Sequence, residues 1–298
     1  MLTQETRVDI HVLHRQVVHF AFMGEEGMVH RLLEAGADVN KLSENYESAL
    51  LASVRMMDAT DPATDPSHDS MFQALIKFPH NQKVLNVRTA KKRLSLLIAG
   101  VETGRVDVVE ALLKLGCEPD FRGGVDLITP LHFCIQRIAT LKDPSSIENI
   151  LDETPDDSVS LDAIRRYIGA PTGMTLPEVK RWLEKQAANP SFKQIRKAVG
   201  KILFNATIKG LDLLVLQDMA MLLINRGADP NAEHAHPIKG YTPVMMAVEA
   251  DEAEIVKALV AAGGSMDKTY LDPHSGSRVN CYAIARYFEA RSVLELVE

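Results

Sequence analysis

Hydrophobic residues recur along this chain in a short pattern that ends on a glycine. Two adjacent apolar residues stand four and three places before the glycine, as in RLLEAGADVN and ALLKLGCEPD. An apolar pair at this spacing predicts the last turn of an amphipathic helix, and the glycine predicts the left-handed cap that only glycine adopts cheaply. The four stretches with this pattern are 31–40, 111–120, 221–231 and 257–267. Their expected caps are Gly36, Gly116, Gly227 and Gly263.

A second helix is predicted ahead of each of these patterns. The segment TPLHFCIQRI at 129–138 opens with a Thr that can cap a helix and a Pro suited to its first position. Thr242 and Pro243 open a similar segment 21 residues before the glycine of the last stretch. The same count back from the glycines of the second and first stretches leads to Ser95 and Arg15. The chain is therefore predicted to be a series of helix pairs.

This arrangement resembles the ankyrin repeat, whose first helix opens with a Thr-Pro-Leu-His motif. Thr129–His132 matches that motif fully. A further unit lies at 46–86, with Pro79 in place of the glycine, and a clipped unit lies at 280–298. Four stretches in register, two of them with a Thr-Pro start, favour this interpretation over a generic helical bundle. The resemblance implies an all-α solenoid of about five to six degenerate repeats.

One of these repeats contains a long insertion. The turn after the helix that starts at Thr129 is expected near Ile138, whereas counting back from Gly227 places it near Val215. The residues between them are predicted to be a helical insertion, because loop closure costs free energy only logarithmically with length and capping boxes precede amphipathic runs within it. The predicted organisation is 1–140 (N-terminal repeats, with an inserted loop at 58–68), 141–212 (helical insertion) and 213–298 (C-terminal repeats and cap).

The resemblance also implies a protein-binding surface, because ankyrin proteins hold their partners in a concave groove lined by first helices and finger loops. The expected fingers are 37–46, 117–128, 228–241 and 264–279. Their aromatic, basic and histidine side chains suit protein contacts as a group. These candidates are Tyr46, Phe121, Arg122, His234, His236, Lys239 and Tyr270. His132, in the Thr-Pro-Leu-His motif, is expected to be structural by resemblance.

Charge within the insertion is polarised. Residues 143–162 hold seven acidic residues and no Lys or Arg, whereas 163–209 is strongly basic. The basic part is a candidate surface for an anionic ligand, with Arg181, Lys185 and Lys197 as its members. Mutual neutralisation of the two halves is the favoured interpretation. Nucleic acid is not the expected partner, since the whole chain has a net charge of −7.

Composition and motifs exclude several classes of function. Three cysteines without CxxC spacing indicate neither a disulfide framework nor a zinc site. The scattered histidines lack a nearby acidic third ligand, so no metal is expected. No nucleophile elbow, phosphate loop, dinucleotide fingerprint or zinc-protease motif occurs, so we expect no enzyme activity and no cofactor. The N-terminus lacks the apolar core of a signal peptide, and no run approaches 18 apolar residues. We therefore expect a soluble cytoplasmic monomer without a transmembrane segment.

These observations predict a module that binds a protein partner through the groove and fingers. Irregular repeat spacing is typical of bacterial ankyrin proteins, which favours an effector delivered into a host-cell cytosol. Two alternatives stay open: an enzyme whose active site lies between insertion and groove, and binding of nucleic acid or anionic lipid through the basic insertion.

Overall fold

The computed structural model describes most of the chain outside the predicted insertion. The described ranges are 10–57, 66–91, 93–124, 127–142, 213–234, 239–272 and 276–297. The chain divides into two units, of which one comprises Met1–Ile138 and Leu211–Glu298 and the other Ala139–Gly210. Residues 58–65, most of the predicted inserted loop, lie outside the described ranges.

The first unit is built from helix pairs, each with a first helix, a short turn and a second helix. The first helices are α1 (Ile10–Phe22), α3 (Ala49–Arg55), α6 (Leu96–Glu102), α8 (Pro130–Lys142), α14 (Pro243–Glu249) and α16 (Cys281–Tyr287). The second helices are α2 (Glu26–Glu34), α4 (Pro66–Leu75), α7 (Val106–Lys114), α13 (Leu213–Asn225), α15 (Ala253–Ala261) and α17 (Arg291–Val297). The molecule is thus mostly helical, as the apolar spacing predicts.

Polar caps fix where most first helices begin. The side chains of Ser95 and Thr242 accept a hydrogen bond from the backbone N–H three residues later, which satisfies an otherwise unpaired donor. Ser48 and Asn280 do the same for α3 and α16. These caps confirm the predicted starts at Ser95 and Thr242. The predicted start at Arg15 is wrong, because α1 begins five residues earlier and Arg15, which lacks a capping oxygen, does not interrupt it.

Left-handed glycines end the second helices, as predicted. The φ angles of the four glycines are all positive: Gly36 94°, Gly116 100°, Gly227 87° and Gly263 95°. The N–H of the residue after each glycine returns to a carbonyl five residues earlier, as in the bond from Ala228 to Leu223. This is the closing bond of a Schellman cap, and it turns the chain from the helix into the finger.

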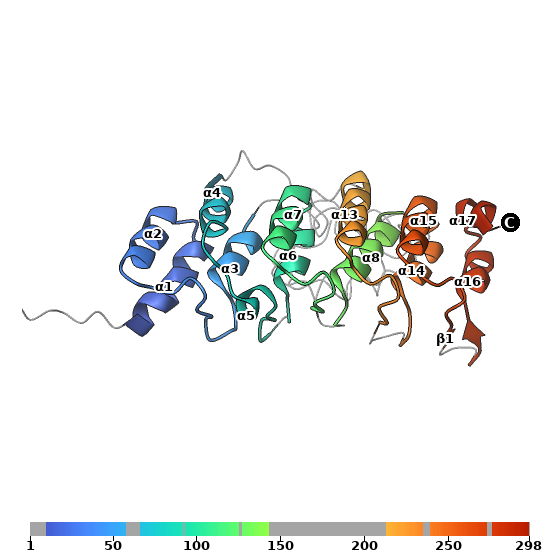
Figure 1. Ribbon diagram of the computed structural model, residues 1–298, viewed down its shortest axis with the longest axis horizontal. Coiled ribbons are helices and arrows are strands. Elements are labelled where there is room, and N and C mark those ends of the chain that lie inside the picture. Colours follow the sequence, from blue (N-terminus) through green and yellow to red (C-terminus); the bar gives the residue numbers. More distant parts are fainter. Residues whose placement is uncertain are drawn as a thin grey trace, which may run out of the picture. The chain divides into compact units, whose positions relative to one another are not determined.

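Second helices form one continuous row and first helices lie beside them. In that row α2 packs on α4, α7 on α13, α13 on α15, and α15 on α17 (Figure 1). Helix α13 therefore occupies the place after α7, although it is about a hundred residues away in sequence. Cys134 of α8 donates to the carbonyl of Leu216 in α13 over 3.1 Å. Arg226 of α13 forms a 2.9 Å ion pair with Glu110 of α7.

The core lies between the helix pairs and is made of leucine, isoleucine, valine and alanine. Leu112 of α7 is fully buried, and a Cβ on Gly100 of α6 would come within 2.9 Å of its Cδ1 atom. Leu131 and Ile135 of α8 and Leu223 of α13 are also fully buried. Close approach of small and branched residues is what allows short helices, which are unstable alone, to stack.

Short strand-like pairs occur in the fingers, so the all-α expectation needs a correction. Strands β1 (Tyr270–Leu271) and β2 (Arg278–Val279) pair antiparallel in the finger that follows α15. Isolated bridges join Arg88 to Ser95 and Gly123 to Ile128. These pairings form because each finger folds back on itself, and its two extended arms satisfy each other's backbone groups.

One finger is missing from the predicted set. It spans 79–95, contains the short helix α5 (Gln82–Leu85), and leads from α4 to α6. The glycine pattern could not locate it, because Pro79 stands at the position that glycine occupies elsewhere.

Candidate interaction surface

Neighbouring fingers are joined by asparagine side chains at equivalent positions. Nδ2 of Asn40 donates to the carbonyl of Pro79 (3.0 Å), and its Oδ1 accepts from the N–H of Asn81 (2.8 Å). Asn231 repeats both bonds with Gly263 (2.8 Å) and Ser265 (2.9 Å). A side-chain amide suits this position because it presents one donor and one acceptor to the next finger.

The same link continues across the predicted insertion, but there a carboxylate replaces the amide. Both carboxylate oxygens of Asp120 lie 3.0 Å from the N–H of Asp229. Burial raises the pKa of Asp120. The negative charge of Asp229 also raises it, whereas the hydrogen bond from the Asp229 N–H lowers it. An ionised carboxylate has no N–H or O–H to donate. Asp120 therefore cannot make the hydrogen bond to a backbone carbonyl that the side-chain amides of Asn40 and Asn231 donate.

Arg122, a predicted partner-binding residue, joins two fingers of its own chain. Its guanidinium donates to the carbonyl of Leu127 (3.1 Å) and, across to the next finger, to that of Glu233 (2.6 Å). Phe121 beside it is half-buried and carries the guanidinium of Arg88 over its ring, 5.1 Å from the centroid. Both side chains therefore contact neighbouring fingers of their own chain. The ring of Phe121 makes a cation–π contact with the Arg88 guanidinium.

His234, another predicted partner-binding residue, is buried under the finger instead of exposed on it. Its ring meets the ring of His132 edge to face, with centroids 5.4 Å apart. His132 itself is fully buried, with Nδ1 2.7 Å from the Thr129 hydroxyl and Nε2 3.4 Å from the carbonyl of Tyr241. Burial, followed by the nearby His234, lowers the pKa of His132 to about 3. The two rings pack α8 against the next finger, which is the structural role that the Thr-Pro-Leu-His motif implies for His132.

Tyr270 packs against its own chain with one face. Its ring meets that of Tyr241 edge to face, with centroids 4.8 Å apart, and it is half-buried. The hydroxyl of Tyr241 donates to the Glu249 carboxylate over 2.5 Å. Burial raises the pKa of both Tyr241 and Glu249, so this pair keeps the phenol protonated.

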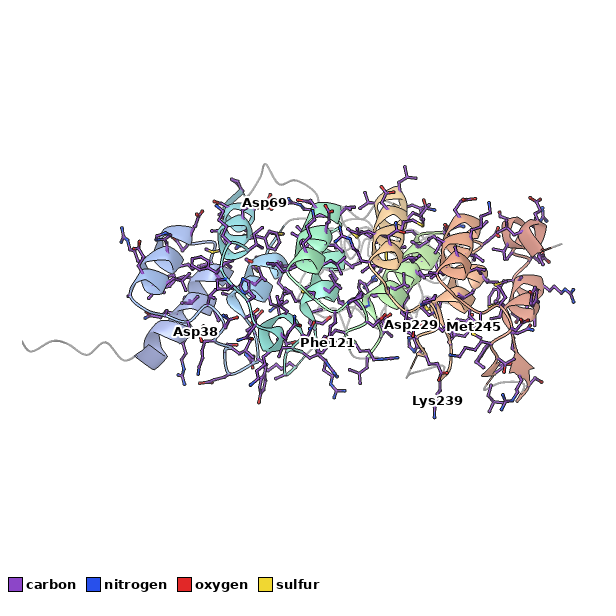
Figure 2. The ribbon with its side chains drawn as sticks, viewed as in Figure 1. Asp38, Asp69, Phe121, Asp229, Lys239 and Met245 are labelled. Carbon is purple, nitrogen blue, oxygen red and sulfur yellow. The ribbon has the colours of Figure 1, made fainter. Side chains whose placement is uncertain are left out.

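Two predicted residues do stand exposed on fingers. Tyr46 is 57% exposed and adopts a left-handed backbone conformation with φ 58°. Lys239 is exposed at the end of its finger, pointing away from the helices (Figure 2). His236 and the basic residues of the predicted insertion, Arg181, Lys185 and Lys197, lie outside the described residues.

The glycine pattern did not point to a set of exposed apolar residues at the C-terminal ends of the first helices. We call them the first-helix ends. They directly precede the left-handed residue of the turn in α1 and α16, where Gly24 has φ 73° and Glu289 has φ 53°. The members and their exposed fractions are Phe22 37%, Met23 56%, Met56 38%, Tyr287 82% and Phe288 48%. The counting that placed the first helices could have flagged these positions, because they follow the last turn of each first helix.

Further along the row the same positions are charged. Arg55, the last residue of α3, forms an ion pair with Glu47. Glu249 is the last residue of α14, the position that Tyr287 has in α16. Tyr287 and Phe288 pack edge to face at 5.0 Å. The C-terminal ends of the first helices thus carry apolar side chains on α1, α3 and α16 and charged side chains such as Arg55 and Glu249 among them. Such a mixture is typical of protein interfaces.

Chemistry-bearing groups are enclosed. All three cysteines are free and buried, and burial raises the thiol pKa of Cys117 and Cys281 to about 12 and that of Cys134 further. Thiols in this state are poor nucleophiles. Within the described ranges no group of three or more His, Cys, Asp and Glu is arranged to bind a metal ion. Over the same residues, every helix is too short or too polar to cross a lipid bilayer.

Comparison with known families places one match on this chain. Residues 239–270, which include α14, α15 and the start of the following finger, match the ankyrin repeat. The comparison with curated proteins returns no match. The matched unit has the Thr242 cap, the Gly263 cap and the finger links that recur through the described unit. On this basis residues 239–270 form an ankyrin repeat.

Proposed function

We propose that this protein binds a protein partner through its fingers and first-helix ends, as a solenoid of five to six ankyrin repeats. Ankyrin repeats are typically binding modules without catalytic activity. The observation that carries the proposal is the set of exposed apolar side chains at the first-helix ends, above all Tyr287 and Phe288. Exposed aromatic rings are a common anchor for a partner.

The repeat number and the insertion are part of the proposal. Finger links made by Asn40, Asp120 and Asn231 at equivalent positions support a continuous stack. The bond between Cys134 and Leu216 supports the view that α8 and α13 belong to one repeat. The domains would then be 1–140, 141–212 and 213–298, with the middle one inserted. The irregular repeat spacing also favours a bacterial effector that acts on host proteins.

The test is affinity capture with the full chain as bait and a eukaryotic cell lysate as the source of partners. Phe22→Ser and Tyr287→Ser each remove one exposed ring from the first-helix ends. Leu214→Ser and Val260→Ser are matched controls, because these apolar residues are exposed on the second helices α13 and α15. All four variants change an exposed apolar residue, so their effects on folding should be alike.

We expect a protein that the wild type and both controls retain and that either first-helix variant loses by about tenfold, since loss of one anchoring ring at an interface costs more than 1 kcal/mol. The proposal fails if no protein distinguishes the two pairs of variants, or if the controls lose the same protein.

A further inference from the structure

The finger at 79–95 differs in charge from the rest of the chain. Between Asp69 and Glu102 there is no acidic residue, in a protein whose net charge is −7. The same interval contains six basic residues, which are Lys77, Lys83, Arg88, Lys91, Lys92 and Arg93. We call residues 88–93 the basic tip.

The basic tip presents its charges outward. Arg88, Lys91 and Arg93 are exposed, and none of them forms an ion pair with another described residue. Elsewhere in the described unit basic side chains are commonly paired, as Arg55 is with Glu47. Three exposed cations that form no ion pair raise the local potential and repel one another. An anionic partner would relieve that repulsion.

The backbone of the basic tip is held in place before any partner binds. Thr89 closes the tip, donating its N–H to the carbonyl of Leu94 (3.1 Å) and accepting at its hydroxyl from the Leu94 N–H (3.0 Å). Ala90 donates to the carbonyl of Asn45 in the preceding finger, over 2.9 Å. The carbonyl of Arg93 accepts from Gly124 in the following finger, also over 2.9 Å.

These bonds hold Arg93 at φ 51°, a conformation that a non-glycine residue adopts at a cost. The guanidinium of Arg88 is held as well, over the ring of Phe121. A surface ordered in this way loses little conformational entropy when it binds.

The neighbouring fingers limit the size of the anion. Exposed carboxylates lie on both neighbouring fingers: Asp38 and Glu44 on the preceding finger, where Glu44 pairs with Arg15, and Glu118 on the following one. An extended polyanion, such as a nucleic-acid duplex or an anionic membrane, would meet these carboxylates and be repelled. A short acidic segment of a protein fits on the basic tip alone.

We therefore propose that the basic tip binds a short acidic segment of the protein partner. This inference rests on the proposed function and names the chemistry of one part of the partner. Arg88 and Lys91 supply the charge, and the Arg88 guanidinium, held against the ring of Phe121, can donate paired hydrogen bonds to a carboxylate.

The probe is a fluorescein-labelled decapeptide of glutamate, titrated with the full chain and followed by fluorescence anisotropy at low salt. The test variant is Arg88→Gln/Lys91→Gln. The control, Arg31→Gln/Lys257→Gln, removes the same total charge from exposed residues on the second helices α2 and α15. We expect the test variant to weaken binding by about tenfold and the control by less than about twofold, because close charge pairs carry more of the interaction than distant charges.

Two further probes separate the alternatives: a 20-base-pair DNA duplex and phosphatidylserine vesicles. The inference is overturned if either binds as tightly as the peptide with the same dependence on Arg88 and Lys91. It is also overturned if the peptide does not bind, or if both double variants weaken it equally. Its failure is distinguishable from failure of the proposed function, because the capture experiment with Phe22→Ser and Tyr287→Ser does not involve the basic tip.

Discussion

Replacing Asp120 with asparagine should stabilise the protein. The equivalent residues Asn40 and Asn231 each make two bonds to the next finger, whereas Asp120 only accepts, from the N–H of Asp229. Asp120→Asn supplies an amide donor for the carbonyl of Gly227, which corresponds in position to Pro79 and Gly263. It also removes a half-buried negative charge from beside Asp229.

The size of the effect follows from two favourable terms and one opposing term. A new intramolecular hydrogen bond contributes about 1 kcal/mol net. The raised pKa of Asp120 means that the folded state disfavours the carboxylate, so at neutral pH the charge costs stability and its removal is favourable. The bond from the Asp229 N–H weakens when its acceptor becomes neutral. We expect a net gain of about 1 kcal/mol, or about 2–4 °C in melting temperature for a unit of this size.

The assay is thermal unfolding followed by circular dichroism at pH 7, with urea unfolding for the free energy. Asn231→Asp is the converse control: it removes the donor to Gly263 and should lower stability by a similar amount. The reasoning is refuted if Asp120→Asn melts at or below the wild-type temperature while Asn231→Asp is destabilised. In that case the ionised carboxylate would be worth more than the amide at this junction.

Three further predictions concern the core and its joints. The folded state holds the pKa of His132 near 3, below the ordinary value of 6.5, so the unfolded state binds more protons and the free energy of unfolding should fall as pH drops from about 6.5 towards 3, by up to about 1.4 kcal/mol per pH unit. His132→Gln should flatten this slope in urea unfolding, and an unchanged slope would contradict the assignment. Gly100→Ala should lower the free energy of unfolding by about 1–3 kcal/mol, because its Cβ would crowd Leu112. The same substitution should cost much less in a Leu112→Ala background, where the methyl group has room, and equal costs in the two backgrounds would disprove the steric account. In native protein the three buried cysteines should react with a thiol reagent only at the rate of unfolding, and rapid labelling of Cys134 would show that α8 and α13 separate readily.

The helix framework could be predicted because its signals are local. The left-handed glycines at Gly36, Gly116, Gly227 and Gly263 and the caps at Ser95 and Thr242 each depend on a few neighbouring residues, and all are confirmed. The start of α1 was wrong because no capping oxygen marks it. The domain boundaries stay a prediction, although α13 begins at Leu213, two residues before the point at which the spacing placed the turn between the two helices, near Val215.

The candidate surface was harder to predict, because exposure on a finger depends on contacts with the next finger. Arg122 and His234 have the composition of interface residues, yet one bonds to Glu233 and the other lies under His132. Neither contact follows from periodicity. The finger at 79–95 was missed because Pro79 replaces its glycine, and its charge pattern became informative only once the fold showed that Arg88 and Lys91 share one tip.

The contacts of α13 with α7 and α15 have a consequence for how the chain tolerates cleavage. Helix α13 and the finger after it are attached to the N-terminal half by the Arg226–Glu110 ion pair, the Asp229–Asp120 bonds and the buried contact between Cys134 and Leu216. A single cut between 143 and 212 would leave these attachments intact. The two fragments should therefore stay together after nicking, and separately made 1–142 and 213–298 should assemble when mixed, with the covalent connection unnecessary for holding the two halves in register.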